Sequence, residues 1–276
     1  MREKQIVRLY QKNLSVRQVA RRIGISPITV SRTLKRCGVK ARAFCNQGKY
    51  SCDEHYFDEI DTEEKAYWLG FLLADGCIRT NSNMLSVNLS SVDIGHLNKL
   101  RKCLKSNNRL YYQKGGTCGL SCLTISSKPL TKSLAAKGIV AHKKWPYKVL
   151  PKLRKHFWRG VVDGDGCISL TYNKNTPQIS VSLVGTRETI DLFYEFCCTI
   201  VETKAQPERD YRGNQTDNFR LHGPKALKVC EVLYDGAKVF LVRKRAKYKK
   251  YKTISDRYRS SERYLNCTKK KHEQNT

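Results

Sequence analysis

Two stretches of the sequence decide the fold: AYWLGFLLADGCI at residues 66–78 and HFWRGVVDGDGCI at residues 156–168. They begin 90 residues apart, and their tryptophan, first glycine and closing Asp-Gly-Cys-Ile occupy equal positions. Agreement at so many fixed positions indicates an internal duplication. A period of this length is a duplicated domain rather than a solenoid, because solenoid repeats run about 20–50 residues.

The residues that follow each stretch repeat the same order of elements. In the first copy, periodicity predicts a strand at MLSVNLSS, a helix at 93–105, strands at RLYYQK and LSCLTIS, and a helix at 128–137. In the second copy it predicts a strand at QISVSLV, a helix at 186–200, strands at 204–211 and 218–221, and a helix at 224–234. Each half therefore reads helix, two strands, helix, two strands, helix.

The helix that opens each half carries a stripe of small residues. Gly70 and Ala74 lie four residues apart in the first helix, and Gly160 and Gly164 do so in the second. Small residues at this spacing allow two helix backbones to approach closely. We therefore expect the two helices to pack against each other about a pseudo-two-fold axis.

This packing would bring Asp75 and Asp165 together at the C-terminal ends of the two helices. Two carboxylates near the negative ends of two helix dipoles are unfavourable without a cation. A hard divalent ion such as Mg²⁺, bound through oxygen, would resolve the repulsion and serve phosphodiester cleavage. The alternative is that each Asp-Gly only ends a helix.

With these residues the chain resembles the LAGLIDADG homing endonucleases, specifically the single-chain type with two motif copies, here Trp68–Gly76 and Trp158–Gly166. The resemblance covers about residues 62–252. It implies an α+β fold of duplicated αββαββα repeats, whose two sheets form a saddle on the DNA major groove. Two positions depart from the pattern. Leu73 replaces the first acidic residue of the motif, and Arg159 replaces a small residue and should point away from the helix seam.

The resemblance implies a site-specific, divalent-metal-dependent DNA double-strand endonuclease that recognises a long site. It would cleave both strands across the minor groove, leave short 3′ overhangs and promote the spread of its own gene as a mobile element, as in intron homing. It implies these site residues: Asp75 and Asp165 as catalytic metal ligands, Ala74 and Gly164 as further ligands of Mg²⁺ or Mn²⁺, and Lys143 and Lys244 as catalytic basic residues with Lys144 and Arg243 as alternatives.

The saddle strands should present alternate polar side chains to the bases. The candidates in the first copy are Arg79, Asn81, Asn88, Arg109, Tyr111 and Gln113. Those in the second copy are Tyr172, Lys174, Gln178, Ser180, Arg209, Arg212 and Gln215. Each could also be an ordinary solvated strand residue, because exposed strands alternate polar and apolar residues for solubility too.

Residues 15–23 and 26–35 predict two short helices separated by Gly24, with Ser15 and Ser26 as N-caps. The pattern resembles the helix-turn-helix of recombinases and transcription regulators, whose second helix enters the major groove. This resemblance predicts that the following residues face DNA: Ser26, Thr29, Ser31, Arg32 and Lys35. A small interaction domain is the alternative.

Charge supports a nucleic-acid partner. The chain carries a formal charge of +29, of which residues 1–43 and residues 238–276 each contribute +11. Such basic arms fit phosphate neutralisation with counterion release. The sequence lacks a run long and apolar enough for a membrane span or signal peptide, so we expect a protein that is not secreted and works where the host genome resides. We interpret the 12 cysteines as reduced thiols, and Cys118 and Cys122 lack the second pair that a zinc site needs.

The sequence thus predicts five segments: a helix-turn-helix domain at 1–43, a linker at 44–62, repeats at 63–150 and 151–252, and a basic tail at 253–276. The chain should be a monomer with internal pseudo-two-fold symmetry that binds double-stranded DNA. Two alternatives use the same scaffold, a non-catalytic DNA-binding regulator and an intron RNA maturase.

Overall fold

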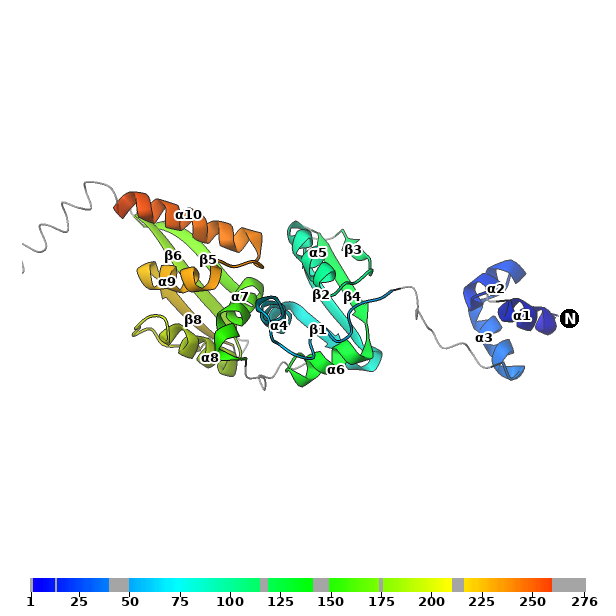
Figure 1. Cartoon of the computed structure of the whole chain (residues 1–276). Helices are drawn as coiled ribbons and strands as arrows, with labels where there is room; N and C mark the ends of the chain where they lie inside the picture. Colours follow the sequence, from blue (N-terminus) through cyan, green and yellow to red (C-terminus); the bar gives the residue numbers. More distant parts are fainter. Residues whose placement is uncertain are drawn as a thin grey trace, which may run out of the picture. The chain divides into compact units, whose positions relative to one another are not determined.

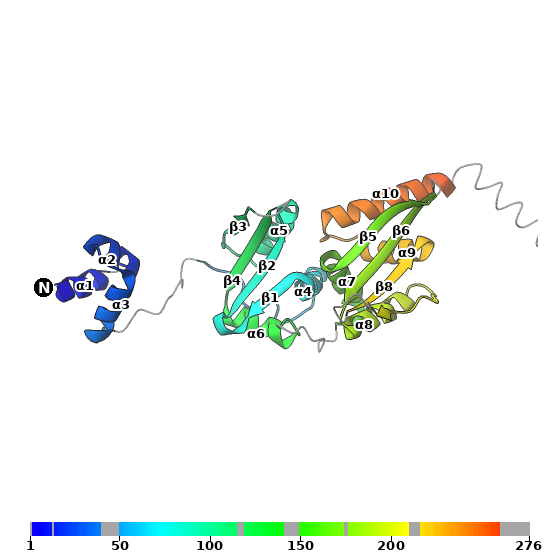
Figure 2. The same ribbon diagram turned by 180° about the vertical axis from the view of Figure 1, so that it is seen from behind.

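The computed structural model describes residues 2–12, 14–39, 50–114, 119–140, 149–173, 176–209 and 216–259 (Figures 1 and 2). The chain divides into two compact units, Met1–Tyr50 and Ser51–Thr276. Within the described residues, no helix has the length and apolar character that crossing a membrane requires.

The first unit contains α1 (Arg2–Gln11), α2 (Val16–Ile23) and α3 (Pro27–Arg36). The two predicted N-caps are present: Ser15 forms a capping box with Gln18, and the Ser26 side chain accepts from the backbone N–H of Thr29 at 3.1 Å. Gly24 ends α2 in the left-handed conformation, with φ of +70°.

Helix α1 was not predicted from the sequence, yet it completes the core of this unit. Ile6 and Tyr10 of α1 pack with Val19 of α2 and Leu34 of α3. Ile28, an apolar residue of α3, is 64 % exposed. Ile28 is the second residue of α3, and this position lies outside the face that α1 and α2 cover.

The second unit contains the duplicated αββαββα fold. The first repeat consists of α4 (Glu63–Asp75), β1 (Gly76–Arg79), β2 (Met84–Ser90), α5 (Ile94–Cys103), β3 (Leu110–Gln113), β4 (Leu120–Ser126) and α6 (Lys128–Ala136). The second repeat consists of α7 (Arg154–Gly164), β5 (Gly166–Asn173), β6 (Thr176–Gly185), α8 (Arg187–Cys198), β7 (Glu208–Arg209), β8 (Asp217–His222) and α9 (Gly223–Tyr234). The predicted order of elements is confirmed.

Each repeat has a four-stranded antiparallel sheet, in the orders β1-β2-β4-β3 and β5-β6-β8-β7. One face of each sheet is covered by helices: α5 and α6 in the first repeat, and α8 and α9 in the second (Figure 1). Alternation along the strands divides the residues between the two faces. In β2, Leu85, Val87 and Leu89 are buried toward the helices, whereas Asn88 on the other face is exposed.

Two elements differ from the prediction. The strand expected from Lys204 begins only at Glu208, because Pro207 has no N–H to donate to a ladder. Helix α10 (Val242–Arg259), which was not predicted, packs on β5, β6 and α9 and passes the predicted boundary at residue 252.

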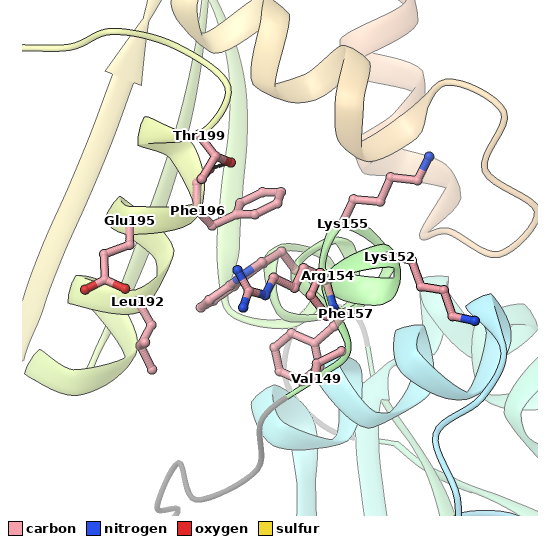
Figure 3. A pocket seen from close by; sticks show the side chains of 11 residues that line it. Val149, Lys152, Arg154, Lys155, Phe157, Leu192, Glu195, Phe196 and Thr199 are labelled. Atoms are coloured by element: carbon pink, nitrogen blue, oxygen red, sulfur yellow. Dashed lines mark hydrogen bonds between the residues drawn. The ribbon is translucent and has the colours of Figure 1, made fainter.

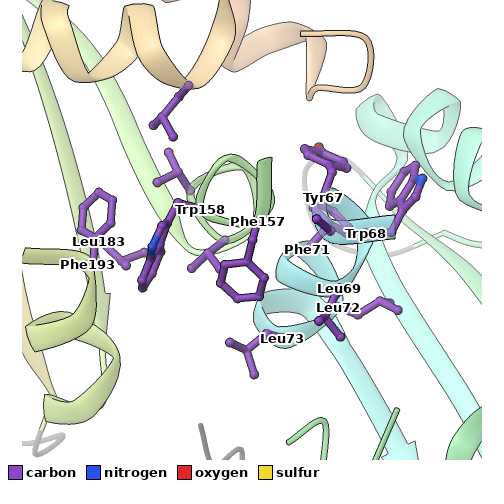
Figure 4. Close-up of a cluster of buried hydrophobic side chains, with 14 of the residues drawn as sticks. Tyr67, Trp68, Leu69, Phe71, Leu72, Leu73, Phe157, Trp158, Leu183 and Phe193 are labelled. Carbon is purple, nitrogen blue, oxygen red and sulfur yellow. The ribbon is translucent and has the colours of Figure 1, made fainter. Parts of the chain in front are cut away.

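The centre of this unit is the contact between α4 and α7 (Figure 4). A Cβ atom on Gly70 would collide with the carbonyl oxygen of Phe157, and one on Gly160 would lie 2.7 Å from the backbone nitrogen of Phe71. The glycine stripe therefore does what the sequence predicted and lets the two backbones touch. The motif tryptophans, Trp68 and Trp158, point away from this seam, each into its own repeat.

Arg159 does not point away from the seam as predicted. It is 1 % exposed, and its guanidinium donates to Glu63 Oε1 at 2.8 Å, at the first turn of α4. It also donates to the carbonyls of Leu233 and Val239, at 3.0 and 2.8 Å. A buried arginine needs such partners, so Arg159 joins α4 to the segment that follows α9.

Candidate functional site

The seam brings the ends of α4 and α7 together. A Cβ atom on Gly164 would touch the Cβ of Ala74 and lie 3.2 Å from Asp75 Oδ2. The carboxylate of Asp75, the last residue of α4, therefore lies at the end of α7, where Asp165 is the C-cap. Asp75 is half-buried and Asp165 is exposed.

The chemistry of these groups fits a hard divalent cation. The described residues contain no group of three or more His, Cys, Asp or Glu side chains arranged as a metal site. The candidate donors are therefore the two carboxylates and backbone carbonyls, and Mg²⁺ is commonly held by one or two carboxylates with its remaining positions filled by water and substrate phosphate. Ala74 lies beside Gly164 at this end of the seam, and the Gly164 carbonyl accepts a hydrogen bond from Lys244 at 3.1 Å.

Lys244, predicted as a catalytic basic residue, is 3 % exposed near the start of α10. Its ammonium donates to the carbonyls of Val162 at 2.8 Å and Asp163 at 2.7 Å at the end of α7, and to that of Gly166 at 2.6 Å at the start of β5. Burial lowers the pKa of Lys244 to about 8. A cation at this place satisfies orphan carbonyls of the helix. Lys244 therefore caps α7 and is not exposed to a phosphate.

The other basic candidates lie elsewhere. Arg243 is exposed and pairs with Asp93 at 2.9 Å, which ties the start of α10 to the first repeat. Lys143 and Lys144 lie outside the described residues.

Sequence reasoning missed Asp163, a buried carboxylate two residues before Asp165. It accepts from the hydroxyls of Tyr67 and Tyr234, at 2.7 and 2.6 Å, and from the backbone N–H of Leu241 at 2.7 Å. Burial raises the pKa of Asp163, opposed by these hydrogen bonds. The available signal was its position: Asp163 matches the first acidic residue of the motif, where the first copy has Leu73.

The uncovered face of the first sheet, which we call polar face 1, is defined by strand register. It consists of Cys77, Arg79, Met84, Ser86, Asn88, Ser90, Tyr111, Gln113, Leu120, Cys122, Thr124 and Ser126. Four predicted DNA-reading residues fall on it: Arg79, Asn88, Tyr111 and Gln113. All four are exposed. Asn81, in the turn after β1, and Arg109, before β3, are exposed outside the strands.

The uncovered face of the second sheet, polar face 2, consists, among residues whose side chains are described, of Cys167, Ser169, Thr171, Thr176, Gln178, Ser180, Ser182, Val184, Glu208, Asn218, Arg220 and His222. Of the predicted residues, Gln178 is exposed on this face. Ser180 also lies on it but is 9 % exposed and bonded to Ser169 at 2.7 Å. The exposed side chains of Arg220 and His222 were missed.

Two predicted residues of the second repeat lie on the helix-covered face of the sheet, opposite to polar face 2. Arg209 pairs in register with Asp217, which is buried toward the helices, and Tyr172 shares the face of Ile168. A shift of one residue in strand register moves a side chain to the opposite face, and the sequence did not fix the register here. Lys174, Arg212 and Gln215 lie outside the described residues.

In the first unit, the predicted residues of α3 are all exposed: Ser26, Thr29, Ser31, Arg32 and Lys35. The Ser26 side chain already makes hydrogen bonds within its own helix: it caps α3, and its hydroxyl is hydrogen-bonded to that of Thr29 at 2.7 Å. Exposed Ile28 adds an apolar group to this surface, of the kind that contacts thymine methyls.

Comparisons with known proteins support the helix-turn-helix in the first unit and the duplicated fold in the second. Residues 3–37 match the model of a helix-turn-helix domain. The chain is similar in structure to the meganuclease I-SmaMI bound to uncleavable DNA with a TTCT central four, with TM-score 0.51 and 12% identity over 75% of this chain and 97% of that one. The same meganuclease on DNA with a TTGT central four gives TM-score 0.51 and 13% identity over 75% and 94%.

The chain has the fold of the LAGLIDADG homing endonucleases. One such enzyme, I-LtrWI bound to target DNA, is 13% identical over 77% of this chain and 95% of that chain, with TM-score 0.49. No protein of curated function matches the sequence. In this LAGLIDADG fold, the paired helices α4 and α7 carry the two motif aspartates.

Proposed function

We propose that the chain is a site-specific, divalent-metal-dependent DNA double-strand endonuclease that hydrolyses phosphodiester bonds and acts in homing. The observation that carries the proposal is the placement of Asp75 beside the end of α7, where Asp165 follows. Two carboxylates at adjacent helix ends repel each other when both are ionised, and a bound divalent cation would offset that repulsion.

Side chains on polar faces 1 and 2 would position the DNA. Polar faces 1 and 2 offer exposed donors, among them Arg79, Gln113 and Arg220, to base edges and phosphates. Lys244 fixes the end of α7, and so the backbone that carries Asp165. When bound by Asp75 and Asp165, Mg²⁺ or Mn²⁺ would supply Lewis-acid polarisation of the phosphodiester and activation of water.

Double-stranded DNA is the proposed partner, with α3 of the first unit as a second contact. Because a single chain contains both aspartates, a monomer would suffice for both strands. The proposed place of action is wherever the host genome resides.

One observation favours a second candidate, a non-catalytic DNA-binding regulator. The Lys244 ammonium bonds the Gly164 carbonyl, a predicted metal ligand, so a second cation at that oxygen would be repelled. A cleavage assay on DNA that carries the sequence flanking the gene distinguishes the two functions.

The experiment is incubation of the purified chain with supercoiled DNA that carries the sequence flanking its own gene, joined across the gene's position, with Mg²⁺ or EDTA. We expect a discrete linear product with Mg²⁺ only. Asp75→Asn and Asp165→Asn should abolish it while gel-shift affinity persists, and Asp191→Asn, at a carboxylate of α8 paired with Arg187, should leave it intact. Cleavage at wild-type rate by either seam variant would refute the endonuclease proposal, and binding without cleavage by wild type would favour the regulator.

A further inference from the structure

A pocket of about 580 Å³ lies between the start of α7 and helix α8 (Figure 3). Its lining residues come from α7, α8 and the turn before α7, and none belongs to polar face 1 or 2. The volume falls in the range of ligand pockets. The proposed nuclease activity does not use this pocket.

The pocket combines an apolar floor with a basic rim. Phe157, Trp158 and Phe196 form the floor, and each is at most 9 % exposed. The rim carries three exposed cations, Lys152, Arg154 and Lys155, against one carboxylate, Glu195. None of the three forms an ion pair with another residue in the described part of the chain.

The equivalent place in the first repeat is filled by the chain itself. Residues 51–61 cross the end of α5, where the backbone N–H of Asp53 donates to Leu104 O at 2.7 Å. Tyr56 then lies against the start of α4: its hydroxyl donates to Glu64 Oε1 at 2.8 Å, and Lys65 Nζ lies 5.8 Å from its ring centroid. This segment, SCDEHYFDEID, is acidic and aromatic.

The 90-residue period relates the two places residue by residue. Lys65 matches Lys155, Trp68 matches Trp158, and Glu64 is replaced by Arg154. The motif tryptophans confirm the match, because each contacts the end of the following helix. Trp68 Nε1 donates to Cys103 Sγ at 3.2 Å, and the Trp158 and Phe196 rings lie 6.0 Å apart.

We infer that this pocket binds a segment of a partner protein that carries an aromatic side chain next to carboxylates. The aromatic group would occupy the place that Tyr56 fills in the first repeat, above the floor and near Lys155. In the first repeat, the Tyr56 hydroxyl donates a hydrogen bond to the Glu64 carboxylate. Arg154 stands at the matching position and can only donate, so the occupant of the pocket must supply an acceptor, namely a carboxylate. The sequence of residues 141–148, AHKKWPYK, contains three lysines and no carboxylate, so it lacks the acidic group that complements the rim.

The test uses the full chain without DNA and a fluorescent peptide, Ser-Ser-Asp-Glu-His-Tyr-Phe-Asp-Glu-Ile-Asp, which has the sequence of residues 51–61 with serine in place of Cys52. Fluorescence polarisation should show saturable binding, weakened about tenfold or more when both aromatic residues of the peptide are alanine. Thr199→Trp, on the exposed rim, should fill the pocket and abolish binding while circular dichroism and unfolding stay unchanged.

A charge control separates the pocket from the general basicity of the chain. Reversal of the rim by Lys152→Glu, Arg154→Glu and Lys155→Glu should abolish binding. The same change of charge on another surface, at Lys204, Lys225 and Lys228, should leave at least half of the affinity. Equal loss in both triple variants would overturn the proposal. Peptide binding seen only after Trp145→Ser with Tyr147→Ser would also overturn it, because the chain's own segment would then be the occupant.

Discussion

The hydroxyl of Tyr67 in α4 donates to Asp163 Oδ2 in α7 at 2.7 Å, across the seam between the repeats. The same carboxylate binds Tyr234 of α9 and the backbone N–H of Leu241. One buried anion thereby holds the paired helices, the last helix of the second repeat and the segment that leads to Lys244. The geometry of the end of α7, where we propose the metal site, depends on this cluster.

Removal of partners from this cluster should destabilise the fold in proportion to the bonds lost. Tyr67→Phe should lower the free energy of unfolding by about 1–3 kcal/mol, and Asp163→Leu, which leaves three donors unsatisfied, by about 3–5 kcal/mol. Tyr172→Phe, at a 58 % exposed hydroxyl, should change it by under about 0.5 kcal/mol. Guanidinium unfolding measures all three. Equal effects of the two tyrosine variants would show that the seam bond is unimportant.

His96 should make stability depend on pH. Burial lowers the pKa of His96 to about 3, and Lys99 and Arg243 add to the effect. The unfolded chain, with a pKa of about 6.5, then takes up the proton first, so the stability from neutral His96 is complete above about pH 6.5 and is lost as the pH falls toward 3. We expect wild type to lose about 2 kcal/mol more than His96→Gln between pH 7.5 and 5. His222→Gln, at an exposed imidazole, should behave as wild type, and a parallel loss in all three proteins would contradict the prediction.

The close contact of α4 and α7 should make the seam intolerant of a single methyl group. Gly70→Ala would place its Cβ against the Phe157 carbonyl and 3.1 Å from Val161 N, so we expect a loss of about 3 kcal/mol or more. Gly95→Ala in α5 meets nothing within 4 Å and should be neutral or stabilising by up to about 1 kcal/mol. Thermal unfolding of both variants gives the comparison. A seam variant as stable as the Gly95 variant would mean that the helices separate at little cost.

The repeat, the seam and the order of elements could be predicted from sequence because each depends on local pattern. Gly70 and Gly160 recur at a fixed period, and Ser15, Ser26 and Gly24 are capping residues whose effect is confined to a turn. Such signals need no knowledge of distant contacts.

The residues that the sequence did not place correctly are positioned by contacts with distant parts of the chain. Lys244 was expected at a phosphate because its segment is basic, but the carbonyls it caps lie about 80 residues earlier in α7. The face of Arg209 was misjudged because the register of β7 against β8 is set by pairing with Asp217, which no local pattern shows. The role of Asp163 likewise required partners from α4 and α9.

The corrected register leads to a matched test on DNA. Arg220 lies on polar face 2, whereas Arg209 shares the face of buried Asp217. Arg220→Ala should weaken DNA binding and reduce the slope of log affinity against log salt by about 0.9, the share of one phosphate contact. Arg209→Ala, with the same loss of charge, should leave the slope unchanged. The opposite result would place the DNA on the helix-covered face of the second sheet.

Helix α3 of the first unit should contribute separately to DNA affinity. Arg32 and Lys35 are exposed on α3, and Arg32→Gln with Lys35→Gln should lower the salt slope of the full chain on a mixed-sequence duplex by about 2, because two phosphate contacts release their counterions. The control is Lys4→Gln with Arg8→Gln, which removes two exposed cations of α1. Titration at several salt concentrations gives both slopes. Equal slopes in the two variants would mean that α3 does not enter DNA and that the first unit is an interaction domain, since net charge alone would then explain its effect.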